Sequence, residues 1–160
     1  GLDTPPGVMR EDIVSADDLH RAALAHADAD LVIAAAAVAD FAPAEPSDRK
    51  TKKSEDDLTL RLRRTPDVLA ALGERKRDGQ VLVGFALETH DGEVHARAKL
   101  EKKNLDWIVL NHANEDGAGF GPGTNRVTLL GADGYKEDLA RMPKTQVAEV
   151  LLDLITVRLE

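Results

Sequence analysis

Several kinds of residue are missing from this chain, and each absence excludes a class of protein. Cysteine does not occur among the 160 residues, which excludes disulfide bonds, thiolate metal sites and a cysteine nucleophile. No apolar stretch approaches the roughly 20 residues that a membrane-spanning helix needs, and no signal peptide opens the chain. We therefore expect a cytoplasmic protein without a membrane partner.

Positive charge is also scarce. The chain has 29 acidic against 21 basic residues and a formal net charge of −8. Nucleic acids and anionic membranes require a broad positive surface, so we expect neither as a partner. The exception is the stretch "SDRKTKKSEDD" at 47–57, in which four basic side chains stand among acids and hydroxyls: Arg49, Lys50, Lys52 and Lys53.

Length and composition predict one globular unit. A chain of 160 residues, 42% of them hydrophobic, can bury roughly two-thirds of its unfolded surface in one core. It begins "GLDTPPGVMRED", without Met and with a Pro-Pro-Gly turn, which is typical of a chain that starts inside a domain. We expect residues 1–160 to form a single, partial domain that lacks its N-terminal portion.

Short apolar runs and helix-start signals predict the elements of the first half. The stretch "LVIAAAAV" at 31–38 has two interpretations, because its alanines favour a helix whereas its β-branched start, short length and missing polar face favour a buried parallel strand. We interpret it as a strand. The expected order is a strand at 11–14, a helix from a capping box at Ser15 and Asp18 to His26, the strand at 31–38, a half-exposed strand from Leu58, and a helix from Thr65 and Pro66 to Arg77.

The second half repeats the alternation of apolar strand and polar helix. The expected elements are strands at 81–86 and 105–111, a helix at 91–103, a Gly-rich loop at 112–125, a strand leading to a hairpin turn at Asp133 and Gly134, and a helix at 144–159 with one apolar face. This βαβα order predicts an α/β fold, a Rossmann-like three-layer sandwich with a mostly parallel sheet.

Ligands of open α/β sheets bind beyond the carboxyl ends of the strands. The alanines of "AVADFAP" allow a ligand to approach the backbone, and Asp40 is placed to bind ribose hydroxyls or a metal-bound water. The alternative is tight packing of the alanines under a helix, with Asp40 in a turn. Phe85 follows the next strand, where it either stacks on a base or packs in the core.

Two further features suit an anion. Lys99 and Lys103 lie one turn apart on the expected helix, where like charges repel unless an anion or the helix dipole compensates them. The helix start "TPDVLAAL" offers free backbone donors. The alternative interpretations are a solvated lysine face and a helix start that binds only water.

Other candidate sites are rejected on spacing. We interpret the histidines at 20, 26, 90, 95 and 112 as single surface residues, because none has metal-ligand spacing with a neighbour. The glycines at 117, 119, 121 and 123 are no phosphate-binding loop, since the Lys-Ser/Thr ending is missing. No nucleophile elbow or Ser/His/Asp signature is present.

In combination the motifs are much more specific. "AAAVADFAP", "KTKK", "TPDVL", "VGFALET", "ARAKLEKKNLDWIVLN" and "NRVTLL" occur in this order. Together they closely resemble the bacterial phosphopantothenoylcysteine synthetase family, from about Pro5 to the C-terminal helix. That family comprises CTP-dependent ligases of coenzyme A biosynthesis, often fused behind a flavin-dependent decarboxylase.

The resemblance implies roles for individual residues. Lys50 belongs to a mobile flap, residues 44–57, that closes on the phosphates and acts in catalysis. Lys99 and Lys103 hold the triphosphate. The implied nucleotide-binding set is Ala34, Ala35, Ala36, Asp40, Lys50, Pro66, Asp67, Val68, Leu69, Phe85, Lys99 and Lys103.

The implied chemistry has two steps. The carboxylate of 4'-phosphopantothenate attacks the α-phosphorus of CTP to give an acyl-cytidylate and pyrophosphate, and the amine of cysteine then displaces CMP. Lysines and Mg²⁺, whose ligands the sequence does not identify, would stabilise the developing charge. The resemblance also implies a homodimer.

The chain departs from the family because the upstream strand, its glycine-rich turn and an Asn-containing segment that handles the acyl intermediate are absent. We therefore expect these 160 residues alone to turn over poorly or not at all. Two other functions stay open. One is a non-catalytic nucleotide-binding fragment, and the other is a Rossmann oxidoreductase, although no G-x-G-x-x-G motif is present.

Overall fold

The computed structural model describes residues 3–47, 49, 57–88, 91–112 and 123–157. Its main sheet has five strands in the order β1-β4-β5-β6-β7. The first three are parallel, and β6 and β7 run antiparallel to their neighbours. The strands are β1 (Leu31–Ala34), β4 (Val81–Glu88), β5 (Trp107–His112), β6 (Thr124–Gly131) and β7 (Lys136–Pro143). The expected Rossmann-like α/β fold is confirmed, with an antiparallel hairpin added at one edge.

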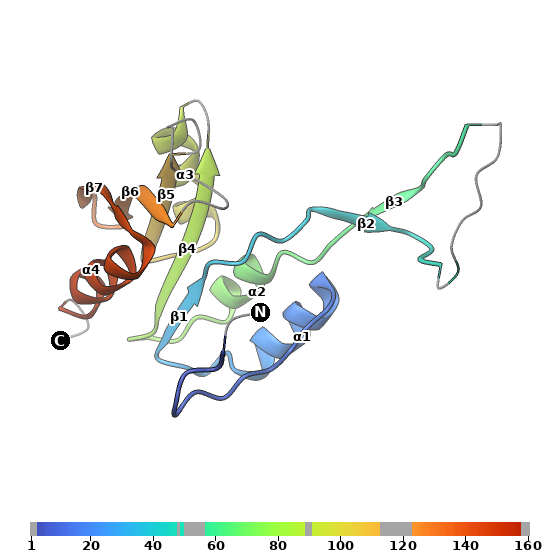
Figure 1. Cartoon of the computed structure of the whole chain (residues 1–160), viewed down its shortest axis with the longest axis horizontal. Helices are drawn as coiled ribbons and strands as arrows, with labels where there is room; N and C mark the ends of the chain where they lie inside the picture. Colours follow the sequence, from blue (N-terminus) through green and yellow to red (C-terminus); the bar gives the residue numbers. More distant parts are fainter. Residues whose placement is uncertain (1–2, 48, 50–56, 89–90, 113–122, 158–160) are drawn as a thin grey trace.

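Helices cover the two faces of this sheet and make it the middle of three layers (Figure 1). One face packs against α1 (Ala16–Ala25), α2 (Val68–Glu74) and α3 (Gly92–Lys102). The other face packs against α4 (Lys144–Thr156), whose buried side chains are Val147, Leu151 and Ile155. The apolar face expected for the C-terminal helix is therefore confirmed.

A narrow two-stranded ribbon projects from the body of the molecule (Figure 1). It consists of β2 (Phe41–Pro43) and β3 (Leu62–Arg64), which pair antiparallel. The guanidinium of Arg64 lies 5.5 Å from the centre of the Phe41 ring, a cation–π contact that joins the strands at their base. The predicted flap, residues 44–57, lies largely outside the described residues, as do Lys50, Lys52 and Lys53.

Three expected strands differ from the structure. Residues 11–14 form no strand, and Val14 is 99% exposed, because no neighbouring strand within the described ranges pairs with them. The strand expected at 31–38 ends at Ala34, where its pairing with β4 ends. The strand expected from Leu58 begins at Leu62, opposite Pro43, since pairing rather than alternation decides its length.

The second helix begins later than expected. Thr65 is not the cap, because its hydroxyl donates to the carbonyl of Ala39 at 2.5 Å. Asp67 caps α2 instead, accepting a hydrogen bond from the backbone N–H of Ala70 at 3.1 Å, and the helix ends at Glu74. Within the described residues, no helix combines the length and apolar character needed to cross a bilayer.

Candidate functional site

The residues predicted after the first buried strand lie at the carboxyl edge of the sheet. Ala34 is the last residue of β1 and pairs with Gly84 of β4, whereas Ala35, Ala36 and Asp40 follow the strand and are exposed. The carbonyl of Asp40 accepts a hydrogen bond from the N–H of Thr65 at 3.0 Å. This bond holds Asp40 beside the segment that starts α2.

The start of α2 contributes the exposed carboxylate of Asp67 to this edge. Val68 and Leu69 are partly buried and pack against the core beneath α1 to α3, and Pro66 is half-buried. Their side chains therefore support the helix start, and any contact of this segment with a ligand would come from its backbone and from Asp67.

Lys103 reaches Asp67 from the end of α3. Its Nζ lies 3.0 Å from Oδ1 of Asp67, and its side chain is 22% exposed. The backbone of Lys103 lies against the last turn of α2, where a Cβ on Gly73 would stand only 2.0 Å from the Lys103 carbonyl oxygen. The side-chain amide of Asn104 donates to the Gly73 carbonyl at 3.0 Å. Because residue 73 is glycine, α3 can end close enough for Lys103 to extend along α2 to its cap.

The ionisation of Asp67 follows from these contacts. Partial burial raises the pKa of this carboxyl, but the hydrogen bonds from the Ala70 N–H and from Lys103 outweigh it, and the net pKa is lowered. Asp67 is thus an anion that holds an ammonium group at a helix N-terminus, where free backbone N–H groups also favour negative charge.

The remaining predicted residues do not all lie near the contact of Asp67 with Lys103. Lys99 lies on α3 one turn before Lys103, on the same side of the sheet as α2. Phe85 pairs with Val109, whose side chain is in the core under α4, so Phe85 points to the α4 face of the sheet, away from α2 and α3, and is 37% exposed. Asp67 and Lys103 are in contact, Asp40 is beside their helix start, Phe85 does not converge with them, and Lys50 lies outside the described residues.

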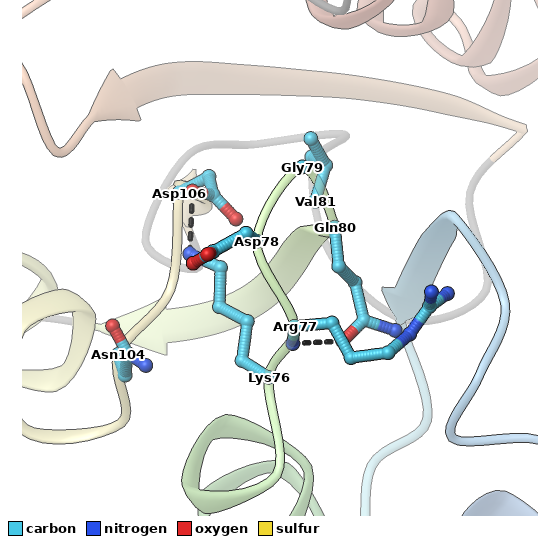
Figure 2. A pocket seen from close by; sticks show the side chains of 8 residues that line it. All are labelled: Lys76, Arg77, Asp78, Gly79, Gln80, Val81, Asn104 and Asp106. Carbon is cyan, nitrogen blue, oxygen red and sulfur yellow. Dashed lines mark hydrogen bonds and ion pairs between the residues drawn. The ribbon is translucent and has the colours of Figure 1, made fainter.

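A hollow of about 410 Å³ lies at the other edge of the sheet, before β4 and β5 (Figure 2). Its charged groups serve the fold. Lys76 Nζ donates to Asp106 Oδ1 at 2.6 Å, Asp106 Oδ2 accepts from the Leu82 N–H at 2.7 Å, and the Gln80 amide donates to the carbonyls of Ala27 and Ala29. These polar groups join α1, α2 and β5 to the start of β4, so this hollow is structural.

His112 is not the isolated surface residue that its sequence spacing indicated. It ends β5, is half-buried, and its Nε2 lies 2.9 Å from the hydroxyl of Thr128, which donates to Asp138 Oδ1 at 2.6 Å. Sequence reasoning missed this series of hydrogen bonds because His112 and Thr128 are 16 residues apart, Thr128 and Asp138 are 10 residues apart, and the three meet only through strand pairing. Among the described residues, no group of three or more His, Cys, Asp or Glu is placed to hold a metal ion.

Known proteins resemble this chain in sequence and in fold. The model of the DNA/pantothenate metabolism flavoprotein C-terminal domain family matches residues 1–158. The coenzyme A biosynthesis bifunctional protein CoaBC of Bacillus subtilis is 48% identical over 156 residues, which are 96% of this chain and 38% of that protein. CoaBC of Mycolicibacterium smegmatis is 42% identical, over 100% of this chain and 41% of that protein. The chain thus spans about two-fifths of these relatives.

Solved structures agree with this relationship. The crystal structure of the C-terminal domain of CoaBC superimposes with a TM-score of 0.78 at 34% identity, over 99% of this chain and 69% of that one. The Cab2 mutant H337A in complex with phosphopantothenate-cysteine superimposes with a TM-score of 0.53 at 22% identity, over 77% of this chain and 43% of that one, which shows the shared fold. The chain belongs to the family of DNA/pantothenate metabolism flavoprotein C-terminal domains.

Proposed function

We propose that this domain is part of a phosphopantothenate–cysteine ligase of coenzyme A biosynthesis, and that the ligase uses CTP. The observation that carries the proposal is the contact of Lys103 with Asp67 at the start of α2, which gathers an ammonium group, a helix N-terminus and nearby Asp40 at the carboxyl edge of a Rossmann-like sheet. The 48% identity to a protein named coenzyme A biosynthesis bifunctional protein CoaBC supports the assignment of the reaction.

The proposed reaction joins a carboxylate to an amine in two steps. The carboxylate of 4'-phosphopantothenate attacks the α-phosphorus of CTP, which releases pyrophosphate and leaves an acyl-cytidylate. The cysteine amine then forms the amide bond and releases CMP. A structural neighbour, the Cab2 mutant H337A, has been solved in complex with phosphopantothenate-cysteine.

Charge placement is the main task of the protein in the first step. Lys103 and Lys99 would bind the phosphate oxygens, and Lys50 would close over them from the flap, because an ammonium group on a long stem can follow a phosphate as its geometry changes. The backbone donors at the start of α2 would bind the ribose or phosphate edge. Preorganised positive charge stabilises the charge that develops during phosphoryl transfer.

Mg²⁺ is the cation we propose for this site, where it would neutralise phosphate charge. Magnesium is usually held by one or two carboxylates together with substrate phosphates. The exposed carboxylate of Asp40 fits that requirement, whereas the carboxylate of Asp67 already binds Lys103 and the Ala70 N–H. We further propose a homodimer and a decarboxylase domain fused in the native protein, since the relatives named CoaBC are bifunctional and this chain spans about two-fifths of their length.

The test is a pair of measurements on the full-length protein. Calorimetry should show that Mg-CTP binds and that NAD⁺ does not. Pyrophosphate release should require 4'-phosphopantothenate, and the amide product should require cysteine. Tighter binding of NAD⁺ than of CTP would indicate an oxidoreductase, and CTP binding without pyrophosphate release would indicate a non-catalytic nucleotide-binding protein.

A further inference from the structure

A small pocket lies beside the hydrogen-bonded chain of His112, Thr128 and Asp138. It has a volume of about 160 Å³ and is lined by residues of α3, β5, β6 and β7, namely Gly92, Glu93, Leu110, His112, Thr128, Lys136 and Asp138. Drug-sized and cofactor ligands occupy roughly 300 to 1,000 Å³. This pocket is therefore too small for a nucleotide and fits a ligand the size of a single amino acid.

The pocket lies on the same face of the sheet as the contact between Asp67 and Lys103. Leu110 belongs to the core beneath α1 to α3, and His112, two residues further along β5, points to that same face. β1, β4 and β5 are adjacent parallel strands, and neighbouring strands lie about 4.8 Å apart. Ala34, the last residue of β1, pairs with Gly84, which pairs with Ile108, so His112 lies four residues beyond the level at which β1 ends. Two strand spacings across and four residues along the strands place the carboxyl ends of β1 and β5 roughly 16 Å apart.

The hydrogen-bonded chain sets the tautomer of His112. An ionised carboxylate can only accept, so the Thr128 hydroxyl donates its single proton to Asp138 Oδ1 at 2.6 Å. The hydroxyl oxygen can then only accept from His112, and the proton of the neutral imidazole is on Nε2, 2.9 Å from that oxygen. Nδ1 therefore carries the lone pair, and Thr128, which is 2% exposed, holds the ring in place.

A base oriented by a hydroxyl and a carboxylate is the arrangement that proton transfer requires. The pocket also contains charges of both signs, because Lys136 Nζ donates to Glu93 Oε2 at 2.7 Å beside Asp138. The hydrogen bond with Glu93 raises the pKa of Lys136, and the hydrogen bond from Lys136 lowers the pKa of Glu93. Paired opposite charges suit a zwitterion, whose carboxylate binds the lysine and whose ammonium binds the acids.

We propose that this pocket binds the cysteine substrate as a small zwitterionic α-amino acid, and that Nδ1 of His112 is the base that deprotonates its ammonium group. The inference rests on the ligase function proposed above. The ammonium gives one proton to Nδ1, and the resulting amine attacks the acyl carbon of the acyl-cytidylate. The C–N bond forms, the bond from the acyl carbon to the phosphate oxygen breaks, and CMP leaves. The second nitrogen proton goes to solvent, as does the proton held on His112.

His112→Gln in the full-length protein tests the base directly. The glutamine Nε2 can still donate to Thr128, but the variant has no equivalent of Nδ1. We expect pyrophosphate release with CTP and 4'-phosphopantothenate to match the parent, whereas amide formation with cysteine falls about 100-fold or more, the usual contribution of a general base. Thr128→Val keeps the imidazole but removes its orientation, and should lose about tenfold in the same step.

The control is His26→Gln, which replaces an exposed histidine at the end of α1 and should leave both steps unchanged.

A further readout separates a base from a structural role. Hydroxylamine is largely unprotonated at neutral pH, so His112→Gln should still convert the acyl-cytidylate to the hydroxamate at the parental rate.

The rate of amide formation by the parent should also increase with pH, and His112→Gln should abolish this limb of the pH–rate profile. The charged groups facing His112 are Asp138 through Thr128, Lys136 and Glu93, and conservative variants of these should shift that limb without abolishing it. Amide formation by His112→Gln at the parental rate would overturn the inference, as would an equal loss with hydroxylamine. Failure of the parent to release pyrophosphate would instead overturn the proposed ligase function.

Discussion

The Nζ of Lys103 and Oδ1 of Asp67 lie 3.0 Å apart, which joins the end of α3 to the N-cap of α2. The same carboxylate oxygen accepts from the Ala70 N–H at 3.1 Å, so one group both caps a helix and positions a cation. A phosphate that binds at this helix start would meet an ammonium group already held there. The pair therefore connects helix stability with the proposed binding of CTP.

Variants of Asp67 should separate its two roles. Asp67→Ala removes the cap and should lower the free energy of unfolding by about 1 kcal/mol. Asp67→Asn keeps a capping oxygen and should cost clearly less, because asparagine caps helices about as well as aspartate. Urea unfolding of both variants measures the difference, and equal losses would show that the charge, not the cap, stabilises this helix.

The lysines of α3 should bind the nucleotide in its ground state. Lys103→Gln and Lys99→Gln each remove one charge from a rigid helix, and each should weaken Mg-CTP binding about tenfold, the size expected for a charge-assisted hydrogen bond. Turnover at limiting CTP should fall in parallel. Calorimetry measures the CTP affinity and pyrophosphate release measures the turnover. Lys144→Gln, at the start of α4, is the control. Unchanged CTP affinity in both α3 variants would place the triphosphate elsewhere.

The local parts of the fold were predictable from sequence because their signals are local. Ser15 and Asp18 do form the capping box that starts α1, and the spacing of Val147, Leu151 and Ile155 does place them under α4. Such signals involve residues within one or two turns of each other, so no knowledge of the rest of the fold is needed.

Long-range features were not predictable in the same way. Residues 11–14 have a strand-like composition but form no strand, because a strand exists only where a partner pairs with it. The contact of Gly73 with Lys103 and the chain from His112 to Asp138 depend on how helices and strands are placed. The family resemblance gave Asp67 and Lys103 separate roles, and their mutual contact appears only in three dimensions.

The capping box of α1 should be sensitive to acid. The hydrogen bond from the Ser15 hydroxyl, followed by that from Arg21, lowers the pKa of Asp18 from 3.8 to about 2. A carboxyl with a lowered pKa stabilises the folded state fully above pH 3.8, and this stabilisation is lost as the pH falls toward 2. NMR titration of the Asp18 carboxyl measures the pKa directly. Ser15→Ala should return it toward 3.8, and a midpoint near 3.8 in the parent would contradict the contacts described.

Lys50 should behave differently from the lysines of α3. If the flap at 44–57 closes over the phosphates during the reaction, Lys50→Gln should reduce turnover far more than CTP affinity, because a transition-state contact affects the chemical step more than ground-state binding. Pyrophosphate release and CTP titration on the same variant give both numbers, and Arg49→Gln is the neighbouring control. Parental turnover by Lys50→Gln would mean that the basic stretch is only a solvated surface turn.

Gly73→Ala should disturb both stability and nucleotide binding through one contact. The added Cβ would lie 2.0 Å from the Lys103 carbonyl oxygen, a backbone atom that cannot rotate away, so α3 must move from α2. Such overpacking costs about 1 to 3 kcal/mol, although alanine by itself favours a helix. Because Lys103 moves with its backbone, CTP affinity should fall as it does in Lys103→Gln. Gly123→Ala, where an added Cβ meets nothing within 4 Å, is the matched control. Urea unfolding and CTP calorimetry test both effects, and a Gly73→Ala protein as stable as the parent would show that the two helices do not require this close approach.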